Sequence, residues 1–266
     1  MEYFESRIAD LLRKAVGGEP ASSDFMTPQQ GVVASGIAAE SGLKFRLFGG
    51  YETSERNMLF VLPDWAEGFS DAALDDYFKT EYEKNIIPLF LERDAYMTEH
   101  PGEAGRGINH RDYLGALIGA GIDRSRVGDI CVSDEGAAIF LSPEIANFLL
   151  SPQSSLKTVG REKIYIKPFS VPADFDGWRV YEAIEGVGAS SRLDSVLAAL
   201  TRLSREKIKA AVIRGDAEVN YISATKPDID TKPGDILSLR GWGKCRIKSF
   251  TGTKKDRARV SADKYV

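Results

Sequence analysis

Residues 191–220 constrain the fold of this chain more than any other stretch, because they join two helical patterns to the start of a strand. Apolar residues in the first half recur at the spacing of one helix face, namely Leu193, Val196, Leu197 and Leu200. Ser204 is a favourable N-cap for a second helix, and Gly215 lies where a helix commonly ends in the left-handed conformation. Short strands are expected to follow, so the stretch predicts a helix pair packed on a small sheet.

Positive side chains line this predicted helix pair, which has only two acidic residues, Asp194 and Glu206. Five cations lie among its apolar residues, namely Arg192, Arg205, Lys207, Lys209 and Arg214. Arg205 and Lys209 are one turn apart, and such a like-charged pair costs about 0.2–0.5 kcal/mol in an isolated helix. A bound phosphate would reverse that penalty.

Three of these cations are the strongest candidates for contacts to phosphate. Arg192 is expected to begin the first helix, where a cation opposes the helix dipole, so a role in binding explains it better than a role in stability. Arg205 and Lys209 are the other two candidates, and Asp194 is expected to hold Arg192 or Arg205 in place. Arg214 fits a phosphate contact and a favourable charge at a helix C-terminus equally well.

The net charge of −4 conceals a division along the chain. Residues 188–266 contain 17 Lys and Arg against 9 Asp and Glu, a net charge of +8, whereas the preceding residues carry −12. A basic module on an acidic body is expected when one module contacts a polyanion. The alternative is a solvated basic face that has no partner.

The order of predicted elements indicates an α+β fold with three domains. Residues 1–75 predict an N-terminal αβ subdomain with a helix near 27–41, which Thr27 would cap and Pro28 would start. Residues 76–182 read β-α-β-β-α-β, the order of a ferredoxin-like sandwich, and thus a candidate RNA-binding domain. Residues 183–266 contain the helix pair and its small β-sheet.

Several classes of protein are disfavoured by composition. Two cysteines and two histidines without metal-like spacing make a metal centre improbable, and reduced thiols are typical of cytosolic proteins. No apolar run approaches the ~20 residues of a membrane helix, and no secretory signal is recognisable at the N-terminus. The motif His-Arg-Asp at 110–112 resembles a kinase catalytic loop, but kinases have an Asn five residues after the Asp and this chain has Leu117 there. A kinase is therefore disfavoured as well.

Separated segments of the chain resemble a known family. Residues 191–220, followed by KPGDILSLRG, resemble the S4 RNA-binding domain found in a small-subunit ribosomal protein, some pseudouridine synthases and tyrosyl-tRNA synthetases. FMTPQQ, GGYETSERNM, NHRDYLGALIGAGIDRSRVGDI and GTKKDRARVSADKY are similar to the YlmH family of bacterial S4-domain proteins. Because these segments occur in order over nearly the whole chain, it is identified as a member of that family.

The resemblance implies a non-enzymatic cytoplasmic protein that binds rRNA and tRNA, including peptidyl-tRNA, on obstructed large ribosomal subunits. There it would assist ribosome-associated quality control, in which stalled chains receive a C-terminal alanine tail, and a quality-control elongation factor would be a further partner. No cofactor and no membrane partner is expected.

Charge pattern and resemblance together define the expected RNA-binding residues. They are Arg192, Asp194, Ser204, Arg205, Lys209, Arg214, Asn220, Lys226, Arg240, Lys244, Lys254 and Lys255. Asn220 and Lys226 are supported mainly by the resemblance. His110 and Arg111, at the positive end of a predicted helix, form a possible second RNA site. The alternative there is a helix capped by Asn109 that carries a surface histidine.

Two other functions stay open on the sequence. Arg192-Leu193-Asp194 also recurs in the catalytic motif of pseudouridine synthases, so an RNA-modifying enzyme targeted by its S4 domain is one alternative. Against it, Asp194 lies within the small helix pair rather than in a separate large domain, and no catalytic residue is predicted. A scaffold in cell division is the other alternative, because the family name carries an association with a cell-division gene cluster.

Overall fold

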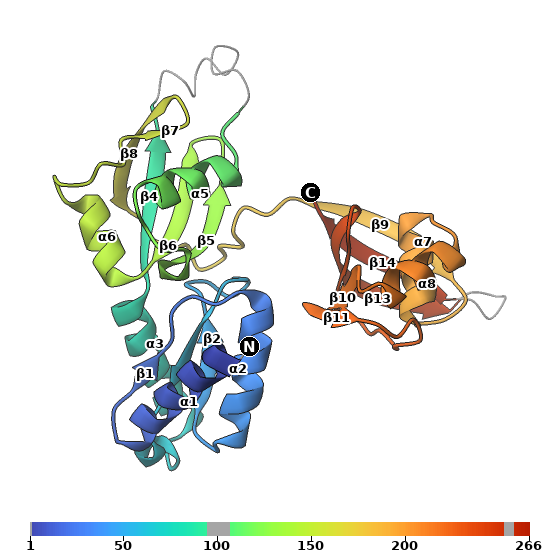
Figure 1. The fold of residues 1–266 in the computed structure, drawn as a ribbon, viewed down its shortest axis with the longest axis horizontal. Coiled ribbons are helices and arrows are strands. Elements are labelled where there is room, and N and C mark those ends of the chain that lie inside the picture. Colours follow the sequence, from blue (N-terminus) through green and yellow to red (C-terminus); the bar gives the residue numbers. More distant parts are fainter. Residues whose placement is uncertain (1, 95–106, 253–257) are drawn as a thin grey trace. The chain divides into compact units, whose positions relative to one another are not determined.

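The computed structural model describes residues 2–94, 107–252 and 258–266, which form two compact units, Met1–Trp178 and Arg179–Val266 (Figure 1). Every strand pairing in this described part is antiparallel, and helices and strands are mixed along the chain. The chain therefore has an α+β fold, as predicted. No helix within these ranges is long and apolar enough to cross a lipid bilayer.

The first part of the N-terminal unit is a three-stranded sheet of order β1-β3-β2 with helices on both faces. Its elements are α1 (Glu2–Val16), β1 (Ala21–Ser22), α2 (Pro28–Glu40), β2 (Phe45–Phe48), β3 (Met58–Val61), the 3-10 helix η1 (Asp64–Ala66) and α3 (Asp71–Asn85). Ile8 of α1 and Ala34 of α2 pack with Leu59, whereas Phe78 of α3 packs with Phe60 in a second cluster. Successive residues of β3 thus face opposite cores.

The predicted helix near residues 27–41 is confirmed as α2. The Thr27 hydroxyl accepts a hydrogen bond from the Gln30 amide at 3.2 Å, and the Gln30 side chain accepts one from the Thr27 amide at 2.9 Å. Pro28 occupies the first helical position, where its missing N–H has no consequence. The start of this helix is therefore encoded locally.

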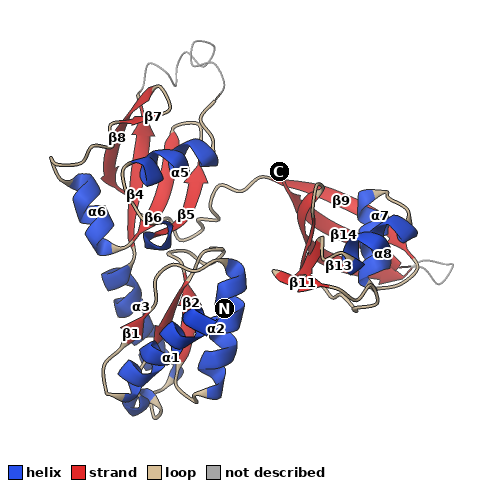
Figure 2. Ribbon diagram, viewed as in Figure 1, coloured by secondary structure: helices blue, strands red, loops and turns tan. Residues whose placement is uncertain are grey.

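The second part of the N-terminal unit is a five-stranded sheet of order β5-β6-β4-β8-β7. Its elements are β4 (Ile87–Arg93), α5 (His110–Gly119), η2 (Arg124–Arg126), β5 (Val127–Val132), β6 (Gly136–Leu141), α6 (Pro143–Leu150), β7 (Thr158–Val159) and β8 (Glu162–Pro168). Helices α5 and α6 cover one face, where Tyr113 and Leu149 pack against Leu91 and Ile139 (Figure 2).

An aromatic cluster closes much of the opposite face of this sheet. Phe90 and Phe140 of the sheet pack with Tyr51 and with residues from the segment 169–178. Within that segment, the Phe175 and Trp178 rings lie 5.0 Å apart, edge to face. The segment forms no strand. It extends the core of the N-terminal unit.

The C-terminal unit is a six-stranded antiparallel sheet of order β11-β10-β12-β13-β14-β9, with α7 and α8 packed on one face. Its elements are β9 (Tyr181–Gly188), α7 (Leu193–Thr201), α8 (Arg205–Ile213), β10 (Ala217–Val219), β11 (Ile222–Ala224), β12 (Ile236–Leu239), β13 (Gly243–Gly252) and β14 (Ala258–Tyr265). Leu197 and Val212 from the helices pack with Ile247 and Val260 from the sheet.

Strand β9 is not among the elements that the sequence predicted. It pairs with β14 along its whole length, from Tyr181↔Tyr265 to Gly188↔Ala258. Most of its side chains are exposed or half-buried, so it lacks the alternation of apolar and polar residues that reveals a half-buried strand. The strand forms because it pairs with β14, which is distant in the sequence.

Candidate RNA-binding surface

The first helix of the pair begins one residue later than expected. Arg192 is the N-cap residue, with extended backbone dihedrals (φ −64°, ψ 142°), and α7 starts at Leu193. The Arg192 side chain makes no capping hydrogen bond. Instead, the amides of Leu193 and Asp194 donate to the carbonyls of Ile229 and Pro227, at 2.8 and 3.0 Å. A loop from elsewhere in the unit therefore caps this helix and fixes the position of Arg192.

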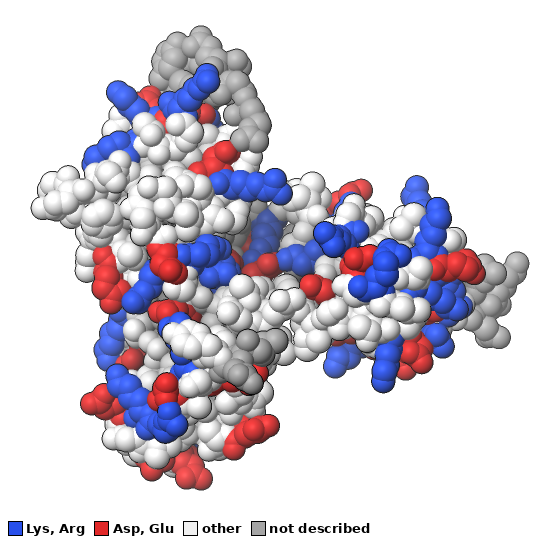
Figure 3. Space-filling view, viewed as in Figure 1, with Lys and Arg blue, Asp and Glu red and all other residues white. Residues whose placement is uncertain are grey.

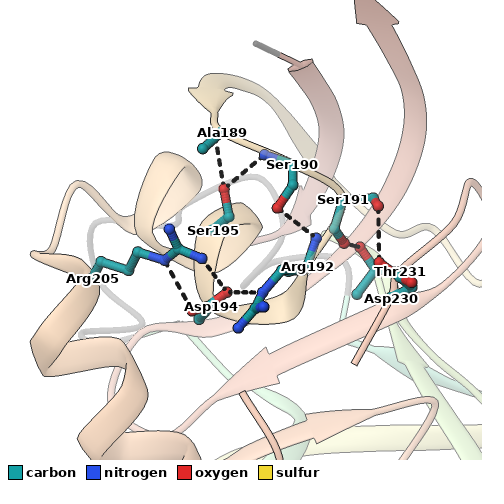
Figure 4. Close-up of polar contacts among 9 residues, drawn as sticks. All are labelled: Ala189, Ser190, Ser191, Arg192, Asp194, Ser195, Arg205, Asp230 and Thr231. Atoms are coloured by element: carbon teal, nitrogen blue, oxygen red, sulfur yellow. Dashed lines mark hydrogen bonds and ion pairs between the residues drawn. The ribbon is translucent and has the colours of Figure 1, made fainter. Parts of the chain in front are cut away.

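Asp194 is fully buried and joins the two helices through both predicted arginines. Its carboxylate accepts hydrogen bonds from Nε and Nη2 of Arg205 at 2.9 and 3.1 Å, and from Nε of Arg192 at 3.3 Å. The two guanidinium groups approach this carboxylate from different sides (Figure 4). The prediction that Asp194 holds an arginine in place is confirmed for both.

The electrostatics of this cluster keep Asp194 ionised. Burial opposes the charge, but hydrogen bonds from Arg205 and then Arg192 outweigh it, and the pKa of Asp194 lies below its ordinary value. The side chains of Arg192 and Arg205 are 40% and 39% exposed, respectively. Both arginine side chains are therefore partly exposed to solvent while they share one buried carboxylate.

The loop before α7 is held by serine and threonine side chains that the sequence reasoning did not single out. Ser195 Oγ accepts hydrogen bonds from the amides of Ala189 and Ser190, at 2.8 and 3.2 Å (Figure 4). The hydroxyl of Thr231 donates to the carbonyl of Ser191 at 2.7 Å. These bonds join β9, α7 and the 227–231 loop around Arg192. Only the folded structure reveals them, because the partners are up to 40 residues apart.

The second helix begins and ends where the sequence predicts. The Ser204 hydroxyl, an expected RNA contact, caps α8 by accepting from the Lys207 amide at 3.3 Å. Lys209 is exposed one turn beyond Arg205 and therefore lies on the same side of α8. Gly215 follows the helix with φ +80°, as expected of a left-handed termination. Lys and Arg side chains outnumber acidic ones over the visible face of this unit (Figure 3).

Other predicted residues fall into separate groups. Arg214 donates to Asp216 from Nε at 3.0 Å, and Arg240 Nη1 lies 4.0 Å from the same carboxylate. Lys244 lies on β13, and its Nζ is 4.4 Å from the ring centroid of Tyr265. Lys226 is exposed after β11. Lys254 and Lys255 lie outside the described residues.

Both ends of the Asn220 side chain are engaged within the unit. Its Nδ2 donates to Asp235 and its Oδ1 accepts from the Ile236 amide, each at 2.9 Å. Its backbone is left-handed, with φ +51°. These contacts fix the turn after β10, whereas the expected contact of Asn220 with RNA stays a prediction.

The possible second site lies at the start of α5 in the N-terminal unit. Asn109 caps the helix by accepting from the Arg111 amide at 2.8 Å, and the Asp112 side chain accepts from the Asn109 amide at 2.9 Å. Burial, followed by the positive charge of Arg124, lowers the pKa of His110 below its ordinary value. His110 is therefore largely uncharged at neutral pH, so any phosphate contact here would depend mainly on Arg111.

The chain is similar to known proteins over one segment and over most of its length. Residues 105–172 match the family model described as "Putative RNA-binding domain in YlmH". A relative from Bacillus subtilis (strain 168), "Ribosome-associated protein quality control protein P2", is 28% identical over 245 residues, which are 91% of this chain and 86% of the relative. The chain is therefore similar to proteins of the YlmH family.

The chain also resembles a solved structure. "Cell division protein ylmH from Streptococcus pneumoniae" superposes with a TM-score of 0.44 and 22% identity, over 66% of this chain and 94% of that one. The YlmH family model ends at residue 172, before the C-terminal unit begins.

Proposed function

We propose that this chain is a non-enzymatic RNA-binding protein of the large ribosomal subunit, with the α7–α8 surface as its principal contact. This surface comprises Arg192, Arg205 and Lys209, together with Asp194, which positions the two arginines. The proposal includes a cytoplasmic location, binding to rRNA and tRNA, and action in quality control of stalled nascent chains that are extended with alanine. A relative named for ribosome-associated quality control supports this assignment.

The observation that carries the proposal is the arrangement of two half-exposed guanidiniums on one buried carboxylate. A guanidinium has five N–H donors in a rigid fork, and Asp194 uses two from Arg205 and one from Arg192. The remaining donors are presented in a fixed orientation, which lowers the entropy lost when they bind an anion. Phosphates of structured RNA match this chemistry, because folded RNA is recognised largely by shape and backbone.

The domain organisation is part of the proposal. Residues 183–266 are proposed to form an S4-type domain, in which a helix pair packs on a small sheet. Residues 76–182 are proposed to form a ferredoxin-like domain, and residues 1–75 an N-terminal αβ subdomain. The antiparallel order β5-β6-β4-β8, with α5 and α6 on one face, supports the ferredoxin-like description.

The decisive experiment is co-sedimentation with large ribosomal subunits. The variant Arg192→Ala/Arg205→Ala is expected to lose binding. Lys248→Ala/Arg259→Ala is the matched control, because it removes the same charge from exposed positions of β13 and β14 in the same unit. If about four or five phosphates are contacted, log K against log salt should have a slope near −3 to −4, and the arginine variant a shallower one. Equal binding by wild type and arginine variant would reject this surface.

A further inference from the structure

Three aromatic side chains form an exposed patch on the N-terminal unit, where η1 is followed by α3. They are Trp65 of η1, Phe69 of the segment between the two helices, and Tyr77 of α3. Each ring contacts the other two, with centroids 5.3–5.5 Å apart. Trp65 and Tyr77 are each 42% exposed. Contiguous apolar surface of this kind commonly marks a site of interaction, and Trp and Tyr are enriched where binding energy concentrates.

The fold holds the rings of this patch in place. Trp65 Nε1 donates a hydrogen bond of 3.2 Å to the carbonyl of Gly18, which follows α1. Phe69 is partly buried against the core cluster that contains Phe78, and Tyr77 is carried by the regular helix α3. Because the rings are positioned before a partner arrives, little conformational entropy would be lost on binding.

The chain around the patch is strongly acidic. Positions 63–78 contain five Asp and Glu and no Lys or Arg. Four of the five are exposed, lie within two residues of a patch ring in the sequence, and make no ion pair with a described residue, namely Asp64, Glu67, Asp71 and Asp76. Asp64 and Glu67 lie on the same side of η1, because a 3-10 helix repeats every three residues. A partner bound at the rings would therefore meet unneutralised negative charge.

The cations of neighbouring elements offset little of this charge. Three of them already pair with carboxylates, namely Lys14, Arg46 and Lys84. Lys79 is two residues beyond Tyr77, about 200° around α3, and so projects from the opposite side of the helix. Lys44, just before β2, is exposed and makes no ion pair among the described residues. The balance around the rings stays negative, so this surface repels phosphate and attracts a cationic ligand.

We propose that the patch binds a segment of a partner protein rich in arginine and lysine, whose cations pack on the Trp65 and Tyr77 rings and pair with the surrounding carboxylates. Guanidinium groups stack on aromatic faces, and cation–π contacts are strongest on tryptophan. The inference goes beyond the proposed RNA-binding function and does not depend on it. It gives the acidic N-terminal unit a basic protein partner, whereas the basic C-terminal unit is proposed to bind RNA.

The test measures binding of a fluorescein-labelled decapeptide of alternating arginine and glycine to the full chain by fluorescence anisotropy. Trp65→Ala/Tyr77→Ala should weaken binding about tenfold, the combined effect of two exposed cation–π contacts. Tyr77→Phe keeps the ring face and should stay within about twofold of wild type. Tyr3→Ala is the matched control, because it removes an exposed ring from α1 of the same unit and should change nothing.

A second pair of variants isolates the charge of the patch. Asp64→Asn/Glu67→Gln should weaken peptide binding and make its salt dependence shallower, since two unscreened attractions are lost. Asp134→Asn/Glu135→Gln is the matched control, because it removes the same charge from exposed positions of the β5–β6 turn in the same unit. An equal loss in this control would show that the peptide responds only to the net charge of the unit, and would overturn the proposal.

The remaining outcomes identify other occupants of the patch. If Trp65→Ala/Tyr77→Ala binds the arginine peptide as tightly as wild type, the proposal is overturned, whatever the chain does with rRNA. Ring-dependent binding of oligouridine, without binding of the peptide, would make the patch a nucleotide site and the proposal wrong. A ring-dependent sedimentation coefficient of the protein alone would assign the patch to the basic C-terminal unit of a second copy, which also contradicts it. Circular dichroism would verify the fold of each variant, and the charge variants decide should the double ring variant unfold.

Discussion

Asn220 Nδ2 donates a hydrogen bond of 2.9 Å to Asp235 Oδ1, and this bond links two turns of the C-terminal unit. Asp235 is 5% exposed and also accepts from the Lys232 amide at 2.8 Å. Asn220 takes the left-handed backbone conformation that asparagine tolerates better than most residues. The pair therefore holds the turn after β10 against the loop before β12.

This contact predicts an ordered series of stabilities. Asn220→Ala should lose both the side-chain bonds and the tolerance of positive φ, at a total cost of about 2–3 kcal/mol. Asn220→Gly should cost less, because glycine restores the backbone freedom. Hydrogen exchange of peptides covering residues 217–239 would measure the difference. Equal protection in Ala and Gly variants would show that the left-handed backbone carries no strain.

Asp194 offers a test of positioning against simple charge. Asp194→Asn removes a negative charge next to the proposed phosphate contacts, so long-range electrostatics alone would tighten RNA binding. If Asp194 acts by orienting Arg192 and Arg205, affinity should instead fall, by about tenfold. Fluorescence anisotropy with an rRNA fragment at fixed salt would decide, and tighter binding would contradict the positioning role.

The pH dependence of the same group has a definite sign. The pKa of Asp194 is lower in the folded chain than in the unfolded chain, so ionised Asp194 stabilises the fold. This contribution is complete above a pH of about 4, the ordinary value for aspartate, and disappears as the pH falls through the lowered pKa. Acid unfolding of the wild type and Asp194→Asn should therefore converge at low pH. Curves that stay parallel down to a pH of about 2 would exclude this linkage.

Arg56 is predicted to be a structural arginine of the N-terminal unit. Its guanidinium donates to the carbonyls of Val127, Phe25 and Arg124 at 3.0, 3.2 and 3.2 Å. Burial, followed by the nearby Arg124, lowers the pKa of Arg56 to about 10, which still leaves it charged at neutral pH. Arg56→Ala should cost about 3 kcal/mol in the free energy of unfolding, because the carbonyls of Phe25 and Arg124 lose this donor and Val127 keeps only its bond from Arg124.

Lysine provides the control for Arg56. It keeps the charge but has no planar fork, so Arg56→Lys should recover less than half of the loss. Urea unfolding followed by circular dichroism would compare the variants. Full recovery by lysine would mean that charge, rather than the three directed hydrogen bonds, is what the fold requires.

Gly186 controls how closely α7 approaches β9. A Cβ atom at this position would lie 2.5 Å from the carbonyl oxygen of Ala199, which is backbone and cannot move alone. Gly186→Ala should thus displace α7 and destabilise the C-terminal unit by about 2 kcal/mol, within the range for overpacking. Gly115→Ala in α5 is the control, since its Cβ meets nothing within 4 Å and should stabilise the helix slightly. Thermal unfolding would show opposite shifts in Tm for the two variants.

Local signals in the sequence were sufficient to predict α2 and α8. Thr27 and Pro28 mark the start of α2, and Ser204 and Gly215 mark the limits of α8, because caps depend on residues only a few positions apart. The association of Asp194 with the arginines was also foreseeable, since it satisfies a buried charge. The Arg214–Asp216 pair, two residues apart, could have been inferred but was not.

Features that depend on partners distant in the chain could not be predicted from the sequence. Strand β9 is recognisable only through its pairing with β14, and Arg192 is positioned by the carbonyls of Pro227 and Ile229 through the amides that follow it. Pattern and propensity describe single segments, whereas these properties arise from how segments are assembled.

The docking of Trp178 into the aromatic cluster leaves only residues 179 and 180 between the N-terminal unit and the first residue of β9. The three Cα–Cα steps from Trp178 to Tyr181 span roughly 10 Å even when fully stretched. If both units bind RNA, so short a connection would raise the effective concentration of the second contact once the first has formed, and two individually weak contacts would give strong avidity. Inserting a long flexible spacer after residue 179 would dilute that advantage without altering either contact.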